Sequence, residues 1–225
     1  MPHLFYGELA GEYVLLDERE THHLKVVRHK VGDVVKITDG KGNLYICKLV
    51  EIGKNRSTAL IEQSNLIERP QENPITLYVA CENWDRLRWL VEKSVEIGVD
   101  EIVVYKSKRS RSFVEKKEKI ELVVREAAKQ CERFLFPRLS VYGHIDFEKL
   151  KGKVVILHKE GEQASLEDFL APVTIVVGPE GDFEKQELEK LSQKGKLLSL
   201  GKKILRFETA AILSLCLAGF TNGRI

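Results

Sequence analysis

The sequence has little of what marks several large classes of protein. Its 225 residues contain four cysteines, one methionine and a net charge of only +2. Neither GxGxxG nor GxxxxGK[ST] occurs in it, which excludes the usual dinucleotide fingerprint and the P-loop. No apolar run approaches the roughly 20 residues that a membrane span needs. These absences describe a globular protein that does not use the common dinucleotide or P-loop motifs to bind a ligand.

The cysteines and the N-terminus point to an ordinary cytoplasmic protein. The stretch MPHLFYGELAGEY lacks the basic and then apolar pattern of a signal peptide, so we expect a cytoplasmic address and no membrane. No CxxC pair occurs, and each cysteine lies within an apolar pattern, which predicts buried thiols rather than disulfides or a metal site: Cys47, Cys81, Cys131 and Cys216.

Residues 1–67 have the pattern of a small β-barrel. Short runs rich in β-branched and aromatic residues predict strands, and glycine-containing turns predict hairpins between them: VVKIT at 34–38, DGKGN at 39–43, LYICKLVEI at 44–52, GKNRS at 53–57 and TALIEQ at 58–63. One helical stretch, ERETHHLKVVRHK, directs Leu24 and Val27 inward and Arg28 outward. Closure into a barrel removes exposed strand edges, which makes it the economical arrangement.

Residues 68–74, ERPQENP, are polar, contain two prolines and predict a linker. From residue 75 to 225 apolar strands alternate with helices. The first of these helices begins after Asn83, which can cap it, and ends at Gly98. Such alternation is typical of an α/β domain with a mostly parallel sheet covered on both faces.

Three strand ends in this second part share a feature that suits ligand binding. The segments 154–162, 176–182 and 198–210 each pass from an apolar strand into a turn with glycine. Strand–turn–helix junctions of this kind hold nucleotide-like ligands in α/β proteins. Exposed backbone at three adjacent strand ends can read the edge of an adenine, because glycine lets a ligand approach closely.

Two motifs at these ends carry a family resemblance. GPEG at 178–181 is followed about twenty residues later by LGKKILRFETA at 200–210. In this order they resemble the SPOUT superfamily of knotted methyltransferases and, more narrowly, the bacterial 16S rRNA (uracil-N3) methyltransferase family. The resemblance covers nearly the whole chain and includes further segments: 20–33, 39–45, 90–102 and 127–139.

The resemblance implies a PUA-like barrel, then a knotted α/β domain that uses S-adenosylmethionine to methylate N3 of a uridine in 16S rRNA or the small ribosomal subunit. It also implies a homodimer with the pocket at the subunit interface. Methylation of another RNA such as tRNA, or a non-catalytic RNA-binding or assembly module, are the alternatives. The cofactor contacts it implies are Leu157, His158, Gly178, Pro179, Glu180, Gly181, Leu200, Gly201, Ile204, Leu205 and Arg206.

The chain departs from the family pattern at three places. MPHLFY stands where a pair of arginines usually occurs near the N-terminus. Asp182 stands where a second glycine is usual, and Phe207 stands where a small hydroxyl residue is usual. We expect Asp182 to be a helix N-cap, because a carboxylate there can accept from the first backbone N–H groups.

Methyl transfer to N3 of uracil needs positioning and removal of the N3 proton. Arg206 is the candidate that stabilises the uracil anion through a ring oxygen, and the alternative is that it only pairs with a carboxylate such as Glu180 or Glu208. Those two glutamates are the candidate bases. The alternative for each is that its negative charge only interacts favourably with the dipole at a helix N-terminus.

Basic residues and the last helix point to partners. The run KSKRSR at 106–111 follows a strand and is either a solvated loop or a phosphate-contacting loop. Arg28, Arg109 and Arg111 are the candidate RNA contacts. The segment ETAAILSLCLAGF is apolar nearly all round, which predicts burial on two sides. The second side packs either against another subunit, as in a homodimer, or simply under the sheet of the same chain.

Overall fold

The computed structural model describes residues 3–112 and 114–225. The chain forms two compact units. The N-terminal unit comprises residues 1–70 together with 125–136, and the C-terminal unit comprises residues 71–124 and 137–225. Among the described residues, no helix has the length and apolar character to cross a bilayer.

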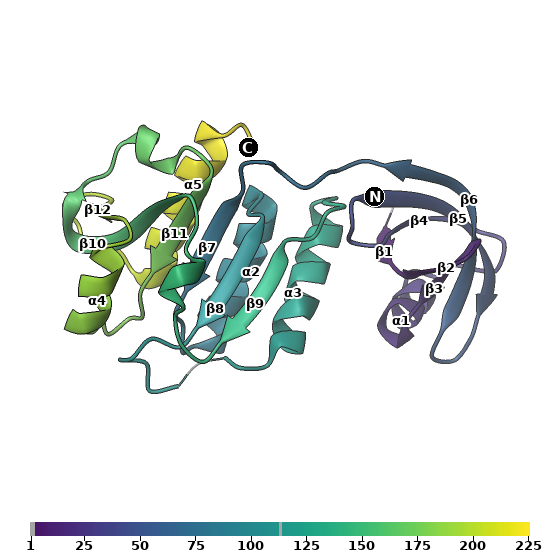
Figure 1. Cartoon of the computed structure of the whole chain (residues 1–225). Helices are drawn as coiled ribbons and strands as arrows, with labels where there is room; N and C mark the ends of the chain where they lie inside the picture. Colours follow the sequence, from purple (N-terminus) through teal and green to yellow (C-terminus); the bar gives the residue numbers. More distant parts are fainter. Residues whose placement is uncertain (1–2, 113) are drawn as a thin grey trace. The chain divides into compact units, whose positions relative to one another are not determined.

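The N-terminal unit is one curled six-stranded sheet with a helix (Figure 1). The order of its strands is β1-β4-β5-β6-β3-β2. The predicted hairpins at 39–43 and 53–57 are confirmed, because β5 pairs antiparallel with both β4 and β6. Its elements are β1 (Leu4–Tyr6), β2 (Glu8–Ala10), β3 (Tyr13–Leu16), α1 (Glu18–Val26), β4 (Val34–Thr38), β5 (Asn43–Ile52) and β6 (Ser57–Leu66).

The helix α1 closes the core of this unit. Asp17 caps it by accepting from the backbone N–H of Glu20 at 2.9 Å. Leu24 is fully buried among the strand residues and Val27 packs beside it, as their spacing predicts. Arg28 is exposed and has a φ of 63°, so the chain turns out of the helix there.

A segment distant in sequence completes the N-terminal unit through buried charge. Glu20 of α1 is fully buried, and its Oε1 accepts from Arg125 Nη2 at 2.6 Å and from Lys129 Nζ at 2.7 Å. Both cations lie on α3 (Lys117–Gln130). Arg125 also pairs with Asp17 at 2.6 Å and lies over the Tyr6 ring. Together with backbone hydrogen bonds between Gly42 and Phe134 and between Phe136 and Gly40, these contacts join residues 125–136 to the unit.

The C-terminal unit is a six-stranded sheet in which every pairing is parallel, in the order β12-β10-β11-β7-β8-β9 (Figure 1). This confirms the α/β class with a parallel sheet. The central strands β7 and β11 are nearly continuous, fully buried apolar runs, as a sheet covered on both faces requires. The strands of this sheet are β7 (Ile75–Val79), β8 (Glu101–Tyr105), β9 (Arg138–Tyr142), β10 (Lys153–Gln163), β11 (Val173–Val177) and β12 (Lys196–Ser199).

Helices cover this sheet. The predicted ends of α2 (Trp84–Ile97) are confirmed: Asn83 accepts from Arg86 N, and Gly98 adopts a left-handed φ of 95°. On one face α4 (Lys185–Ser192) buries Leu191 against the strands. The last helix, α5 (Phe207–Thr221), packs against β11, α2 and the short helix η2 (Leu166–Phe169). A second short helix, η1, spans Phe147–Lys149.

Two local predictions are wrong. The segment 158–162 is not a turn, because β10 continues to Gln163 with a register shift against β12, and Gly161 lets the Leu197–Leu198 backbone approach. Cys131 is exposed rather than buried, because α3 ends one residue earlier. Cys47 and Cys81 are buried as predicted, and Cys216 is half-buried.

Candidate active site

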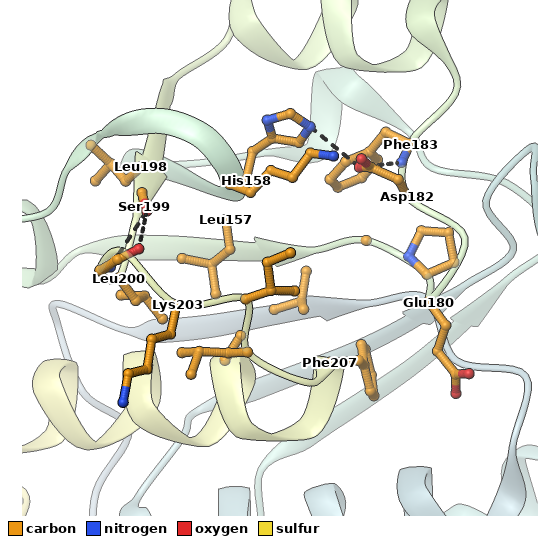
Figure 2. Close-up of a pocket in the computed structure, with 18 of the residues that line it drawn as sticks. Leu157, His158, Glu180, Asp182, Phe183, Leu198, Ser199, Leu200, Lys203 and Phe207 are labelled. Carbon is orange, nitrogen blue, oxygen red and sulfur yellow. Dashed lines mark hydrogen bonds and ion pairs between the residues drawn. The ribbon is translucent and has the colours of Figure 1, made fainter.

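A cleft of about 430 Å³ opens over three neighbouring strands of the C-terminal unit, β12, β10 and β11. Its walls are residues 157–159 of β10, at the register shift of that strand, the ends of β11 and β12 and the segments that follow them (Figure 2). The volume lies in the range of small-molecule sites. The sequence-predicted cofactor residues that line it are Leu157, His158, Gly178, Pro179, Glu180, Gly181, Leu200, Gly201, Ile204 and Leu205.

Glycine occupies three positions of the cleft for different physical reasons. A Cβ at Gly178 would meet the Phe183 ring at 2.7 Å, so glycine is needed there for packing. Gly201 has a φ of 141°, which side-chain-bearing residues rarely adopt. At Gly181 neither reason holds, because its φ is ordinary and a Cβ would meet no atom within 4 Å. Open space around that backbone fits a ligand that approaches it closely.

One side of the cleft is held by a pair that the sequence analysis did not foresee. The His158 side chain is largely buried and its Nε2 lies 3.3 Å from Asp182 Oδ1. Figure 2 shows this pair on one side of the cleft and the Glu180 carboxylate and Phe207 ring on the other. Asp182 also accepts from its neighbour, Phe183 N, at 2.8 Å.

Asp182 is not a helix N-cap, so that prediction is wrong. The helix α4 begins after Glu184, which occupies the cap position. Asp182 instead has a φ of 67°, in the left-handed region where glycine is favoured. A glycine would adopt this turn without strain. In this chain the carboxylate stabilises the turn through its contacts with His158 and Phe183 N.

The three candidate catalytic residues lie in different surroundings. Arg206 caps α5 through its backbone, its side chain is exposed, and it is not among the residues that line the cleft. Glu180 pairs with Arg86 at 2.5 Å rather than with Arg206. Glu208 is half-buried, and its Oε2 is buried without a hydrogen-bond partner among the residues that the structure describes. Like Arg206, Glu208 does not line the cleft, although its neighbours Phe207 and Ala210 do. A free carboxylate oxygen beside the cleft fits a ligand or proton contact.

The pKa of the Cys81 thiol depends in part on the charge of the two glutamates. Burial raises the pKa of its thiol to about 11, and the Glu180 and Glu208 carboxylates act in the same direction. A backbone hydrogen bond at Asn83 and the positive charge of the Arg86 guanidinium oppose the shift. Both candidate bases therefore lie near the end of β7. Cys81 stays a neutral thiol near neutral pH, which argues against a nucleophilic role.

The candidate RNA contacts occur in both units. Arg28 is exposed on the N-terminal unit. Arg109 and Arg111 are exposed on the C-terminal unit, where Arg109 Nη1 donates to the Gly181 carbonyl at 3.1 Å and Arg111 N donates to Glu82 at 2.9 Å. Within the described ranges, no group of three His, Cys, Asp or Glu side chains is placed to hold a metal ion.

Sequence reasoning missed Arg86 and the ring of Phe183. Arg86 lies in the first turn of α2, far in sequence from its partner Glu180, and no motif surrounds it. Phe183 packs beneath Gly178, and only the three-dimensional turn brings the two together. The one signal in the sequence for a packing role of Phe183 is that it is an apolar residue between two acidic ones, Asp182 and Glu184.

Comparison with known protein families identifies the family of the chain that forms this cleft. Residues 69–219 match the family model described as an RNA methyltransferase domain, and residues 16–62 match an RNA methyltransferase PUA domain. The chain belongs to this RNA methyltransferase family. The first match spans the whole cleft, and the second spans α1 and most of the curled sheet.

Individual relatives agree with the family. The Bacillus subtilis protein named Ribosomal RNA small subunit methyltransferase E is 30% identical over 92% of this chain and 90% of its own length. A Thermotoga maritima structure described as a predicted RNA methyltransferase is 40% identical, with a TM-score of 0.87 and full coverage of both chains. A Neisseria gonorrhoeae Ribosomal RNA small subunit methyltransferase E, solved with S-adenosyl methionine, is 25% identical, with a TM-score of 0.81 and coverage of 96% and 95%.

Proposed function

We propose that this protein uses S-adenosylmethionine to methylate N3 of a uridine in 16S rRNA of the small ribosomal subunit. The observation that carries the proposal is the cleft, with open backbone at Gly181 and Gly201, in a chain of the RNA methyltransferase family. Relatives named for small-subunit rRNA methylation and a related structure that contains S-adenosyl methionine support the substrate and the cofactor.

The cleft suits the cofactor by its chemistry. Apolar side chains such as Leu157, Leu200 and Leu205 can cover an adenine ring, while backbone at Gly178–Gly181 and Gly201 offers hydrogen-bonding groups at its edges. When bound, S-adenosylmethionine supplies an electrophilic methyl group on sulfur. The contribution of the protein is to hold the uracil in line with that methyl group and to exclude water.

The chain must also accept the N3 proton and stabilise the uracil anion. Glu208 is the favoured base, because one of its oxygens is buried without a partner among the described residues. Glu180 is the weaker candidate, because Arg86 already pairs with it. Arg206 is exposed and has no side-chain ion pair within the described chain, so its guanidinium can donate to a uracil oxygen.

We further propose that the protein is a cytoplasmic homodimer that pairs through α5. That helix buries Ala211, Leu215 and Ala218 within the chain and exposes Leu213 and Phe220, so its apolar character exceeds what one chain covers. Phe220 is 70% exposed. Phe220→Asp should convert the dimer to a monomer in sedimentation equilibrium, and an unchanged mass would contradict pairing through this helix.

RNA binding is proposed for Arg28 on the N-terminal unit and for Arg109 and Arg111 on the C-terminal unit. All three are exposed, and guanidinium contacts to phosphate give salt-dependent affinity. The trefoil knot that the family resemblance implies also stays a prediction.

The deciding experiment has two parts. Calorimetry with S-adenosylmethionine should show binding, and failure to bind would favour the non-catalytic module. Mass mapping of rRNA and tRNA from cells with and without the gene should show loss of one N3-methyluridine in 16S rRNA. Loss of a tRNA modification instead would assign the enzyme to the other RNA.

A further inference from the structure

The basic loop, residues 106–111, is fastened to the segment that forms one wall of the cleft. Ser107 Oγ donates to Glu187 Oε2 at 2.6 Å, and both residues are buried. Lys108 Nζ lies 3.0 Å from Glu184 Oε2, and Arg109 donates to the Gly181 carbonyl at 3.1 Å. Three consecutive residues of the loop therefore contact the GPEG bend (178–181) or the start of α4.

A second element holds the same bend. Arg86, in the first turn of α2, pairs with Glu180 at 2.5 Å. Glu180 and Gly181 are thus each bound by one arginine, and the two arginines come from different parts of the sheet edge.

The bend is a wall between two hollows. On one side it lines the cleft. On the other side it lines a second hollow, of about 630 Å³, which also contains Arg86, Arg109 and Arg111. Glu180 and Gly181 border both hollows. Arg86 and Arg109, which bind the bend from the second hollow, are therefore placed to hold the backbone that faces the cleft.

We propose that Arg86 and Arg109 are positioning residues of the cofactor pocket, acting through Glu180 and Gly181. This inference rests on the proposed function and extends it. Arg109 fixes the direction of the Gly181 carbonyl, and hence of the peptide plane that follows it. Arg86 holds the Glu180 carboxylate toward the second hollow, so that backbone groups of the bend face the cleft.

Arg109 then has two competing partners, the Gly181 carbonyl and an RNA phosphate. A charge-assisted bond to phosphate is stronger than a bond to a neutral carbonyl. RNA that recruits Arg109 therefore releases the bend, and by reciprocity cofactor bound to an ordered bend weakens the hold of RNA on Arg109. Arg111 differs, because its side chain makes no hydrogen bond or ion pair within the described residues.

The test compares arginines that look alike in sequence. S-adenosylmethionine affinity is measured by calorimetry for Arg86→Ala and Arg109→Ala, with Arg88→Ala and Arg111→Ala as matched controls. Arg88 lies on the same helix as Arg86 but pairs with Glu92, and Arg111 lies on the same loop as Arg109. Because the contacts are partly exposed, each positioning variant should weaken cofactor binding about two- to fivefold, and neither control should.

Hydrogen exchange gives a readout that needs no cofactor. Amides of residues 180–184 should exchange faster in Arg86→Ala and Arg109→Ala than in either control, while α2 exchanges as in the wild type. Arg86→Lys keeps the ion pair with Glu180 and should restore both affinity and protection.

The outcomes separate this inference from the proposed function. Wild-type cofactor affinity and bend protection in both positioning variants would overturn the inference and leave the function standing. Equal loss in Arg109→Ala and Arg111→Ala would also overturn it, because loop charge alone would explain the effect. If wild-type protein binds no cofactor, the proposed function fails, and the exchange comparison still decides whether the arginines hold the bend.

Discussion

The buried ion cluster of the N-terminal unit and the cleft of the C-terminal unit use charge in opposite ways. In the cluster, the carboxylate of Glu20 is fully buried and its Oε1 accepts from two cations, Arg125 and Lys129, while its Oε2 has no hydrogen-bond partner among the described residues. Beside the cleft, Glu208 also has a buried oxygen without a partner, but no cation of the described chain pairs with it, and Arg206 extends into solvent. Charge that serves the fold is compensated within the chain, whereas charge that serves a ligand is left available.

The pKa shifts within the cluster show the same compensation of charge. Although burial opposes it, the Asp17 and Glu20 carboxylates raise the pKa of the Arg125 guanidinium. The pKa of Asp17 is lowered, because its hydrogen bonds from Arg125 and from Glu20 N outweigh burial, the largest opposing cause. The two shifts favour the charged forms of Arg125 and Asp17, as expected for a structural ion pair.

The largest effect is expected in the cluster. Glu20→Gln removes the carboxylate that two buried cations share, and should lower the free energy of unfolding by about 3–5 kcal/mol. Urea unfolding of the full chain measures the loss, and hydrogen exchange of α1 locates it. Glu126→Gln is the matched control, since Glu126 also contacts Lys129, at 3.1 Å, but is exposed. Equal stability of the two variants would show that the cluster is not structural.

A smaller effect, on rate rather than stability, is expected beside the cleft. Glu208→Gln keeps the shape of the side chain but cannot take a proton, so kcat should fall about a hundredfold or more if Glu208 is the base. Cofactor affinity and unfolding should stay at wild-type values. Glu189→Gln, an exposed position on α4, controls for loss of charge near the site. Unchanged kcat would transfer the role to Glu180 or to solvent.

The sequence predicted the elements whose causes are local. Asn83 and Gly98 set the ends of α2, and the turns at 39–43 and 53–57 set the hairpins, because each depends on a few adjacent residues. Strand ends with glycine also predicted which segments meet at the cleft, since parallel strands end at one edge.

Long-range charge pairing was out of reach. Residues 125–136 join the N-terminal unit partly through Glu20, which meets Arg125 and Lys129 across about a hundred residues, and periodicity carries no sign of these contacts. Arg86 was missed for the same reason, because its partner Glu180 is set by topology alone. The Asp182 prediction failed because a capping pattern and a left-handed turn use the same residue types.

The glycines give a way to separate packing from ligand approach. Gly178→Ala should destabilise the protein by about 1–3 kcal/mol, because the new Cβ overlaps the Phe183 ring. Gly181→Ala should leave stability unchanged, since its Cβ meets nothing within 4 Å, yet weaken cofactor binding. Thermal unfolding and calorimetry on both variants test the pair. Full cofactor affinity in Gly181→Ala would show that the open space there is not used.

The smallest effect concerns His23, which borders the ion cluster. Its ring lies against Phe5 and His3, and the charged groups that face it are Lys129, Glu20 and Glu126. Burial, and then the positive charge of Lys129, lower the pKa of His23 below its ordinary 6.5. The folded chain therefore holds this proton less tightly than the unfolded chain, and the stability that neutral His23 contributes above pH 6.5 is lost as the pH falls through its folded pKa. The slope from one proton stays below about 1.4 kcal/mol per pH unit.

Urea unfolding at several pH values between 7.5 and 5 should show this slope in the wild type and a shallower one in His23→Gln. His22→Gln, the exposed neighbour on the same helix, reports the effect of the substitution itself. What remains of the slope after His23 is removed measures the other titratable groups of the chain. If His23→Gln keeps the full wild-type slope, burial beside Lys129 does not govern the ring, and the cluster is more open to water than its contacts imply.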